Sequence, residues 1–268
     1  MPRNDDDFTT DLTTNLSELC IDLAVEAAST AALSRAHQPI FPSATKSSAT
    51  DLVTPSDRAA ERFIRAQLST QRPNDGIIGE EESDLTGTSG LTWIVDPIDG
   101  TTNFVFGLPA WGCSIAVTRG DQLLAGAVHI PALSETYSAT LGRGARCNGS
   151  EIAASATTSF ETALVATGFS YRPQRRAQQG VTVARLLPQV RDIRRSGSAA
   201  YDLCCVAAGT VDAYYEEGLS LWDLAAGALI ASEAGAQVEY SPSGTRTDIA
   251  VVASSPGIFE LLRSVICG

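Results

Sequence analysis

Two aspartates stand close together after an apolar segment in the first half of the chain. In the string WIVDPIDGTTNF, residues 93–104, Asp96 ends the apolar run and Asp99 follows it after a short turn. Because Pro97 cannot continue a strand inside a sheet, the chain turns there and both carboxylates can face one point. Two such charges about 4 Å apart repel by roughly 4 kcal/mol at an effective dielectric constant of about 20, so they need a counter-charge such as a divalent cation.

Gly100 and Thr101 directly follow this pair of aspartates. A glycine allows close approach of the backbone, and successive N–H groups at a turn or helix start can bind a phosphate. Asp-Pro and Asp-Gly are also common in ordinary turns, but the joined string DPIDGTTN after a strand favours a site. Carboxylates for a metal beside N–H groups for a phosphate predict metal-assisted hydrolysis of a phosphate ester.

Three further acidic positions are candidates for the same site. Glu80–Glu82 follow a short apolar run, Asp223 opens an Ala- and Gly-rich helix, and Asp57 lies near the start of another helix. Each has an ordinary alternative. The glutamates could form a solvated acidic loop, Asp223 could interact favourably with a helix N-terminus, and Asp57 could be part of a helix cap. These motifs taken one at a time leave the alternatives open.

Composition limits the other kinds of chemistry. The 268 residues carry 19 basic and 31 acidic side chains, a formal net charge of −12, so broad electrostatic binding to nucleic acid or anionic membranes is not expected. Only two histidines, His37 and His129, are present, which argues against a multi-histidine zinc, iron or copper site. An ordinary structural role is expected for His129.

The cysteines and the chain start indicate the compartment. The six cysteines form no CxxC motif, which is typical of reduced thiols in a cytosolic protein. No stretch approaches about 18 apolar residues, so no transmembrane helix is expected. The acidic start MPRNDDDFTT lacks the apolar core of a secretory signal. We therefore expect a cytoplasmic protein.

The candidate residues must be positioned by helices and strands that the apolar pattern predicts. Helical spacing over residues 16–36 predicts a long amphipathic helix. A second helix over residues 54–68 is predicted to begin with Thr54 as its N-cap and Asp57 at its third position. Short apolar runs separated by Gly, Pro and Asp predict several strands between residues 77 and 131.

The pattern changes near residue 155, where strand-like and helical segments begin to alternate. Such alternation favours an α/β layer. We expect an acidic, frayed tail over residues 1–14, an N-terminal α+β subdomain over 15–154 that carries most candidate metal ligands, and a C-terminal α/β subdomain over 155–268.

These segments together resemble the inositol monophosphatase family of magnesium-dependent, lithium-sensitive phosphatases. The matching strings are KSSATDLVTPSD (46–57), GEE (79–81), WIVDPIDGTTNF (93–104) and WDLAAG (222–227), with RRSGSAAYDL and DAYYEEG between the last two. They follow the family's order from about residue 16 to the C-terminus and are most similar to actinobacterial members. The resemblance implies an α/β fold, a layered αβαβα sandwich with its site between the halves, and a homodimer.

The resemblance also implies a set of metal ligands. Glu80, Asp96 and the backbone carbonyl of Ile98 would hold one Mg²⁺, and Asp96, Asp99 and Asp223 would hold a second. A third, weaker ion is expected near Glu80, so the implied cofactor is two to three Mg²⁺ ions per subunit. The run of three glutamates leaves the register of this ligand ambiguous by one place, and we choose Glu80 because it directly follows a glycine.

The implied catalytic residues are Thr101, Asp57 and Glu80. Thr101 and Asp57 resemble the pair that orients and deprotonates the attacking water in this family. A water bound to a metal ionises far more easily than bulk water, so this chemistry requires no histidine base.

The implied substrate contacts come from both halves of the chain. Gly100 and Thr101 would supply N–H groups to the phosphate, whereas Ala199 and Glu216 match residues that line the pocket for the substrate hydroxyls. A carboxylate accepts hydrogen bonds from a polyol well. An exposed acid at a strand end is the alternative for Glu216.

Three basic residues near these motifs have less defined roles. Arg194 and Arg195 would either guard the pocket or serve a subunit interface. Lys46 matches a lysine near the metal-binding loop, where it would balance negative charge, although a single lysine is usually solvated.

The leading hypothesis is a Mg²⁺-dependent phosphomonoesterase that hydrolyses inositol 1-phosphate to inositol and phosphate. Histidinol phosphate and fructose 1,6-bisphosphate are alternative substrates within the same family. An alternative of another class is a moonlighting role as a binding partner of the transcription machinery, which some bacterial relatives contact. A small phosphorylated polyol and a second copy of the chain are the expected partners, whereas nucleic acid and membrane are not.

Overall fold

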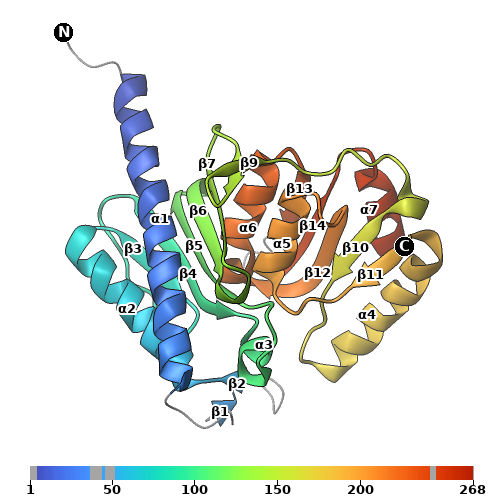
Figure 1. The fold of residues 1–268 in the computed structure, drawn as a ribbon, viewed down its shortest axis with the longest axis horizontal. Coiled ribbons are helices and arrows are strands. Elements are labelled where there is room, and N and C mark those ends of the chain that lie inside the picture. The colour runs from blue at the N-terminus through green and yellow to red at the C-terminus, as the bar shows by residue number, and fades with distance from the viewer. Residues whose placement is uncertain (1–4, 37–43, 46–51, 242–245, 268) are drawn as a thin grey trace.

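Helices and sheets alternate in layers in the computed structural model, which describes residues 5–36, 44–45, 52–241 and 246–267. From one side to the other, two N-terminal helices, a seven-stranded sheet, two central helices, a five-stranded sheet and two outer helices follow one another (Figure 1). The helices are, in this order, α1 (Asp5–Ala36), α2 (Pro55–Gln71), α5 (Ala199–Ala207), α6 (Leu221–Glu233), α4 (Pro173–Leu186) and α7 (Phe259–Cys267). The expected αβαβα sandwich is confirmed.

Helices α1 and α2 pack their apolar faces on the seven-stranded sheet. α1 begins at Asp5, so it includes most of the acidic segment 1–14 that the apolar pattern left outside the predicted helix. α2 begins as predicted: the backbone N–H of Thr54 donates to Asp57 Oδ2 at 2.8 Å, which completes a capping box. It continues to Gln71, somewhat beyond the predicted end.

The first sheet has seven strands in the order β3-β4-β5-β6-β7-β8-β9, antiparallel except for the parallel pair β3 and β4. The strands are β3 (Gly76–Gly79), β4 (Leu91–Asp99), β5 (Gly112–Arg119), β6 (Gln122–Ile130), β7 (Glu135–Thr140), β8 (Ala145–Cys147) and β9 (Ser150–Ile152). The sequence predicted β3 to β6. It identified the turns beside β7, β8 and β9 but not the strands themselves, because these are short and rich in polar residues.

The second sheet has five strands in the order β11-β10-β12-β14-β13. β10 is parallel to β11 and β12, whereas β14 is antiparallel to both of its neighbours. The strands are β10 (Leu164–Thr167), β11 (Asp192–Arg194), β12 (Ala213–Ser220), β13 (Gln237–Ser241) and β14 (Thr247–Ser254). The edge strands β11 and β13 were not predicted. A separate two-stranded pair is formed by β1 (Ala44–Thr45) and β2 (Leu52–Val53).

Helices α5 and α6 belong to one apolar core that reaches both sheets. Its buried members include Ile94 of β4, Leu224 of α6 and Tyr214 of β12. α6 approaches the first sheet so closely that a Cβ added at Gly126 would lie 3.1 Å from the Cα of Ala226. The small residues of α6 therefore allow a helix to be packed tightly between two sheets.

Several expectations about single residues can be compared with the structure. All six cysteines are free thiols. His129 has its Nδ1 2.8 Å from Thr136 Oγ1, which fits the expected structural role, whereas His37 and Lys46 lie outside the described residues. Across the described ranges, no helix combines the length and apolar character needed to cross a bilayer.

Candidate metal centre and active site

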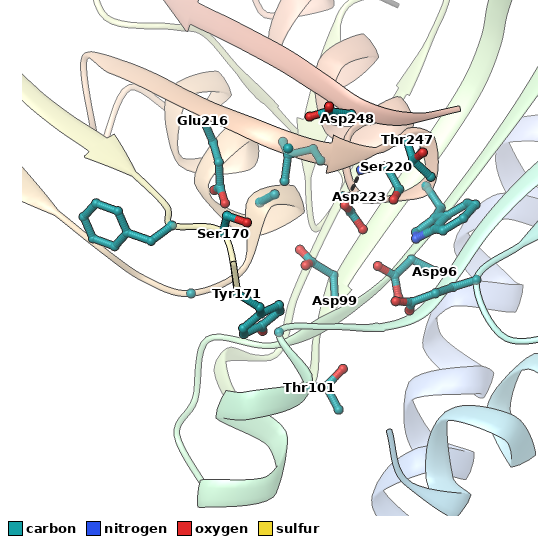
Figure 2. Close-up of a pocket in the computed structure, with 18 of the residues that line it drawn as sticks. Asp96, Asp99, Thr101, Ser170, Tyr171, Glu216, Ser220, Asp223, Thr247 and Asp248 are labelled. Carbon is teal, nitrogen blue, oxygen red and sulfur yellow. Dashed lines mark hydrogen bonds between the residues drawn. The ribbon is translucent and has the colours of Figure 1, made fainter. Parts of the chain in front are cut away.

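A pocket of about 430 Å³ lies where the end of β4 meets the starts of α5 and α6 (Figure 2). Residues of both halves of the chain line it. The first half contributes Glu80, Asp96, Ile98, Asp99, Gly100 and Thr101. The second half contributes, among others, Tyr171, Arg195, Ala199, Glu216 and Asp223. All residues predicted for the site except Asp57 are therefore part of one lining.

Three carboxylates converge at the centre of this pocket. Asp96 and Asp99 come from the end of β4, and Asp223 comes from the first turn of α6. One carboxylate oxygen of each lies within 4.8 Å of the others, and Figure 2 shows the side chains turned toward one another. An arrangement of oxygen donors alone suits a hard cation such as Mg²⁺ or Ca²⁺.

The N-terminus of α5 holds one side of this cluster. Asp99 Oδ2 accepts hydrogen bonds from Ser198 Oγ at 2.6 Å and from the backbone N–H of Ala200 at 2.7 Å. Ser198 is the N-cap of α5. A helix N-terminus stabilises negative charge, so this contact fixes the Asp99 carboxylate from the opposite half of the chain.

Asp223 has two structural roles at the start of α6. Its Oδ2 accepts the backbone N–H of Ser220 at 2.6 Å, and the pair forms the capping box of the helix. The adjacent residue is tied to the first sheet, because Ser114 Oγ donates to the carbonyl oxygen of Trp222 at 3.3 Å. The interaction with a helix N-terminus that was the alternative for Asp223 therefore coexists with its position in the carboxylate cluster.

The electrostatics of the cluster favour a bound cation. Burial, followed by the charges of Glu80 and Asp99, raises the pKa of Asp223 well above its usual range. Burial also raises the pKa of Asp99 to about 6, although the hydrogen bonds from Ser198 and Ala200 oppose this effect. A positive charge beside these carboxyl groups would favour their ionised forms and oppose both shifts. The donor set and its burial both fit a metal ion.

Among the three consecutive glutamates, only Glu80 lines the pocket. Glu82 turns away from it and forms an ion pair with Arg62, with 3.0 Å between Arg62 Nε and Glu82 Oε1. The charge of Glu80 acts on both Asp99 and Asp223. This geometry favours the register in which Glu80 is the ligand.

Thr101 lies between the cluster and helix α2. It is the first residue of the short helix α3 (Thr101–Phe106). Its hydroxyl donates to the carbonyl oxygen of Ile98 at 3.1 Å and lies 3.4 Å from Asp57 Oδ1. Asp57 is fully buried, and its other oxygen accepts Thr54 Oγ1 at 2.6 Å. Asp57 therefore both caps α2 and reaches the threonine of the pocket, although it is not itself part of the lining.

Gly100 allows the chain to turn sharply between β4 and α3. Its φ of +88° lies in the left-handed region that favours glycine. A Cβ at this position would lie 3.0 Å from the carbonyl oxygen of Ala110 and 3.2 Å from that of Gly197. A larger residue at this position would therefore meet both backbone strain and close contacts with the neighbouring carbonyl oxygens.

A second group of carboxyl residues lies on the opposite side of the pocket. Glu216 of β12 accepts Tyr214 Oη at 2.7 Å, and burial raises the pKa of Glu216 to about 7. Asp202 of α5 is also buried, which raises its pKa to about 8. The charge of Arg195 opposes both shifts. Ala199 lies beside them as the first residue of α5. Glu216 is thus a partly buried pocket residue and not an exposed acid.

Several residues that line or support the pocket are absent from the sequence prediction. Ser198, which supports Asp99 from outside the lining, could have been found, because a serine before an Ala-rich segment is a typical N-cap. Nothing in the sequence pattern marks Tyr171, whose hydroxyl lies 3.4 Å from Thr102 Oγ1 across the two halves. Of the two arginines with an open role, Arg195 lines the pocket, whereas Arg194 forms an ion pair with Asp192.

These observations define an acidic pocket, lined by both halves of a layered sandwich, whose carboxylates fit a cation. The model of the inositol monophosphatase family matches residues 13–263, and the chain belongs to this family. Membership supports a phosphatase, and the acidic cluster fits the metal site of such an enzyme.

Individual relatives agree with this assignment. The chain is 45% identical over 238 residues to the inositol-1-monophosphatase of Mycobacterium bovis. The match covers 82% of this chain and 80% of that protein. It is 37% identical over 223 residues to the Nus factor SuhB of Escherichia coli, covering 82% of this chain and 84% of that protein. Its fold matches the structure of Mycobacterium tuberculosis SuhB with a TM-score of 0.82 and 41% identity, covering 95% of this chain and 96% of the other.

Proposed function

We propose that this chain is a Mg²⁺-dependent phosphomonoesterase that hydrolyses inositol 1-phosphate. The observation that carries the proposal is the convergence of Asp96, Asp99 and Asp223 within 4.8 Å, from two halves of the chain. The similarity to mycobacterial inositol-1-monophosphatases supports the choice of substrate.

The carboxylates of the pocket would hold the cations. Glu80, Asp96 and the carbonyl oxygen of Ile98 would bind one Mg²⁺, and Asp96 would share a second with Asp99 and Asp223. Glu80 would also contribute to a third, weaker site. When bound, Mg²⁺ would act as a Lewis acid toward the phosphate and make a water molecule easier to deprotonate.

Thr101 and Asp57 would handle the proton of the attacking water. The Thr101 hydroxyl, 3.4 Å from Asp57 Oδ1, would orient the water, and the buried Asp57 carboxylate would accept the proton through it. No side chain needs to act as a covalent nucleophile, so phosphate would be released directly.

The remaining residues would hold the substrate. The N–H groups of Gly100 and Thr101 would bind phosphate oxygens where the chain turns into α3. Glu216 and Ala199 would contact the polyol on the other side of the pocket. Because the pKa of Glu216 is raised to about 7, its carboxyl group can accept or donate a hydrogen bond to a hydroxyl near neutral pH.

Two related features belong to the same proposal. We expect a cytoplasmic homodimer that is inhibited by lithium, as is typical of the family. Light scattering tests whether the chain forms a homodimer, and a monomer would refute that expectation without affecting the proposal for the catalytic site. A lithium titration of phosphate release tests inhibition by lithium, and activity that is insensitive to lithium would refute this expectation.

A second candidate function is contact with the transcription machinery, favoured by the similarity to the Nus factor SuhB of Escherichia coli. Such a contact would not require hydrolysis. A pull-down of RNA polymerase and its elongation factors with wild-type and Asp96→Asn protein tests it. Equal recovery with both proteins is the expected result for a binding role independent of catalysis, whereas no recovery with either would refute it.

The enzymatic proposal is tested by phosphate release from inositol 1-phosphate, histidinol phosphate and fructose 1,6-bisphosphate, each with Mg²⁺ and with excess EDTA. We expect the fastest release from inositol 1-phosphate and loss of release on chelation. Activity that survives chelation would contradict the metal-dependent mechanism. A clear preference for histidinol phosphate or fructose 1,6-bisphosphate would replace the substrate within the same mechanism.

A further inference from the structure

A buried glutamate of α2 reaches the loop that follows β3. Glu61 is fully buried, and its side chain accepts two backbone N–H groups of this loop. Glu61 Oε2 accepts the N–H of Glu81 at 2.8 Å, and Oε1 accepts the N–H of Glu82 at 3.2 Å. Arg65 on the next turn of the helix donates its Nε to Oε1 at 2.8 Å. The carboxylate is therefore charge-balanced and its acceptor positions are used.

The loop after β3 can approach Glu61 closely because Gly79 has no side chain. A Cβ built at Gly79 would lie 2.2 Å from Glu61 Oε1. This is shorter than any real contact, so a larger residue at Gly79 would displace the Glu61 carboxylate. The glycine that marks the family motif thus makes room for a specific side chain of another helix.

These contacts hold the backbone on both sides of Glu80. Gly79 before it is the last residue of β3, and the next two N–H groups are bound by Glu61. Glu82 is held on the outside, because its carbonyl oxygen accepts Arg65 Nη2 at 3.2 Å. Glu80 is the residue in this run that lines the pocket, and its charge acts on Asp99 and Asp223.

We infer that Glu61 is a positioning residue that holds Glu80 in the pocket lining beside the carboxylate cluster and thereby increases the affinity of the pocket for divalent cations. The inference rests on the proposed function and adds to it a residue outside the pocket lining. A preorganised ligand does not have to be ordered when the ion binds, so weakening its support lowers affinity.

The test must separate positioning from simple stabilisation. Glu61→Gln keeps the size of the side chain but replaces one acceptor oxygen by an amino group that cannot accept an N–H. Asp75→Asn is the matched control. Asp75 is a buried carboxylate of the same half that accepts Arg72 Nε at 2.8 Å and Trp93 Nε1 at 2.9 Å, and it does not line the pocket.

The measurement is the binding of Mg²⁺ to the full chain by titration calorimetry, without substrate. We expect Glu61→Gln to weaken Mg²⁺ binding about tenfold, the lower end of the effect of residues that support metal ligands. Asp75→Asn should lower the midpoint of urea unfolding but leave Mg²⁺ binding within about twofold. Phosphate release by Glu61→Gln should recover as Mg²⁺ is raised.

Gly79→Ala provides a second variant if Glu61→Gln does not fold. It retains Glu61 but pushes its carboxylate away from the loop, so it should also weaken Mg²⁺ binding. Unchanged Mg²⁺ binding in the folded variants, or an equal loss in Asp75→Asn, would overturn the inference. Absence of Mg²⁺ binding by the wild-type chain would instead overturn the proposed function.

Discussion

The two halves of the chain build the pocket in different ways. The first half supplies Asp96, Ile98, Asp99 and Thr101 from one continuous stretch, where β4 ends and α3 begins. The second half supplies Asp223 from a helix start and Glu216 from a strand that lie apart in the sequence. The first half therefore sets most of its part of the cation site locally and adds Glu80 from the loop after β3, whereas the contribution of the second half depends on the tertiary fold.

The two contributions are nevertheless coupled through Asp99. Its carboxylate belongs to the first half, but its hydrogen bonds come from Ser198 and Ala200 of the second. We expect substitutions of the pocket carboxylates of the first half to remove cation binding and catalysis together. Substitutions of Glu216 should instead affect recognition of the substrate.

The largest effect is expected for Asp96→Asn. Because Asp96 would contact both cations, its loss should lower the rate of phosphate release by about 10²–10³-fold. Phosphate release at saturating Mg²⁺ measures the effect, and circular dichroism checks that the variant is folded. A variant that is folded and retains wild-type activity would contradict the assignment of the centre.

Asp223→Asn should have a smaller but still large effect, on the order of 10²-fold, because it removes a ligand of one cation. An asparagine retains an oxygen that can cap α6, so the helix should persist. The dependence of the rate on Mg²⁺ concentration should shift to higher concentrations. An unchanged Mg²⁺ dependence would show that the two halves do not share a cation.

Glu216→Gln should separate recognition from cation binding. Loss of a charged acceptor for a substrate hydroxyl should raise KM about tenfold, which corresponds to about 1.4 kcal/mol. The Mg²⁺ affinity should be unchanged within about twofold. Steady-state kinetics with inositol 1-phosphate and a Mg²⁺ titration provide both values. An equal loss of substrate affinity and of Mg²⁺ affinity would contradict the division of roles between the halves.

Asp202→Asn should change the pH dependence of stability in the absence of Mg²⁺. Burial raises the pKa of Asp202 to about 8, with Ser196, Glu216, Asp99 and Arg195 as its charged or polar neighbours. As pH rises above about 4, the unfolded chain releases this proton while the folded chain retains it, so the free energy of unfolding falls until about pH 8.

Replacement by asparagine removes this contribution. Between about pH 5 and pH 7, the variant should lose less stability than the wild type, by roughly 2–3 kcal/mol. Urea unfolding at the two pH values measures the difference. Parallel pH dependences for both proteins would show that Asp202 is ionised in the folded chain.

The smallest effect is expected for Arg246→Gln. Arg246 forms an ion pair with Asp84 that connects the two halves at the surface. The backbone carbonyl oxygen of Arg246 accepts the N–H of Leu221 at 2.8 Å, a contact that the substitution leaves in place. Both partners are exposed, so loss of the pair should reduce the free energy of unfolding by at most about 1 kcal/mol. Mg²⁺ affinity should not change. A large loss of Mg²⁺ binding would show that this pair aligns the halves.

The local part of the site could be predicted from the sequence. Asp96, Asp99, Gly100 and Thr101 lie in one string whose residue types and turn chemistry already indicate a metal and phosphate site. The start of α2 was predictable for the same reason, because Thr54 and its neighbours form a local capping motif. Such features depend on residues a few positions apart, which the linear pattern contains.

The tertiary part could not be predicted from pattern alone. The contact of Asp99 with Ser198 joins residues far apart in the chain, and no period or dipeptide reports it. Asp223 was placed in the site through family resemblance, not through spacing. The strands β7 and β13 do alternate apolar and polar residues, but each has only two apolar core-facing positions, Tyr137 and Ala139 in β7 and Val238 and Tyr240 in β13. So short an alternation does not stand out in a sequence.

The shared position of α5 and α6 has a consequence for how the chain can be divided. Each sheet buries one of its faces against these same two helices, which are encoded entirely after residue 198. A fragment that stops near residue 154 would expose the inner face of its sheet to water and should aggregate when expressed alone. The intact chain should accordingly melt in a single calorimetric transition, with no plateau in which one sheet survives the other.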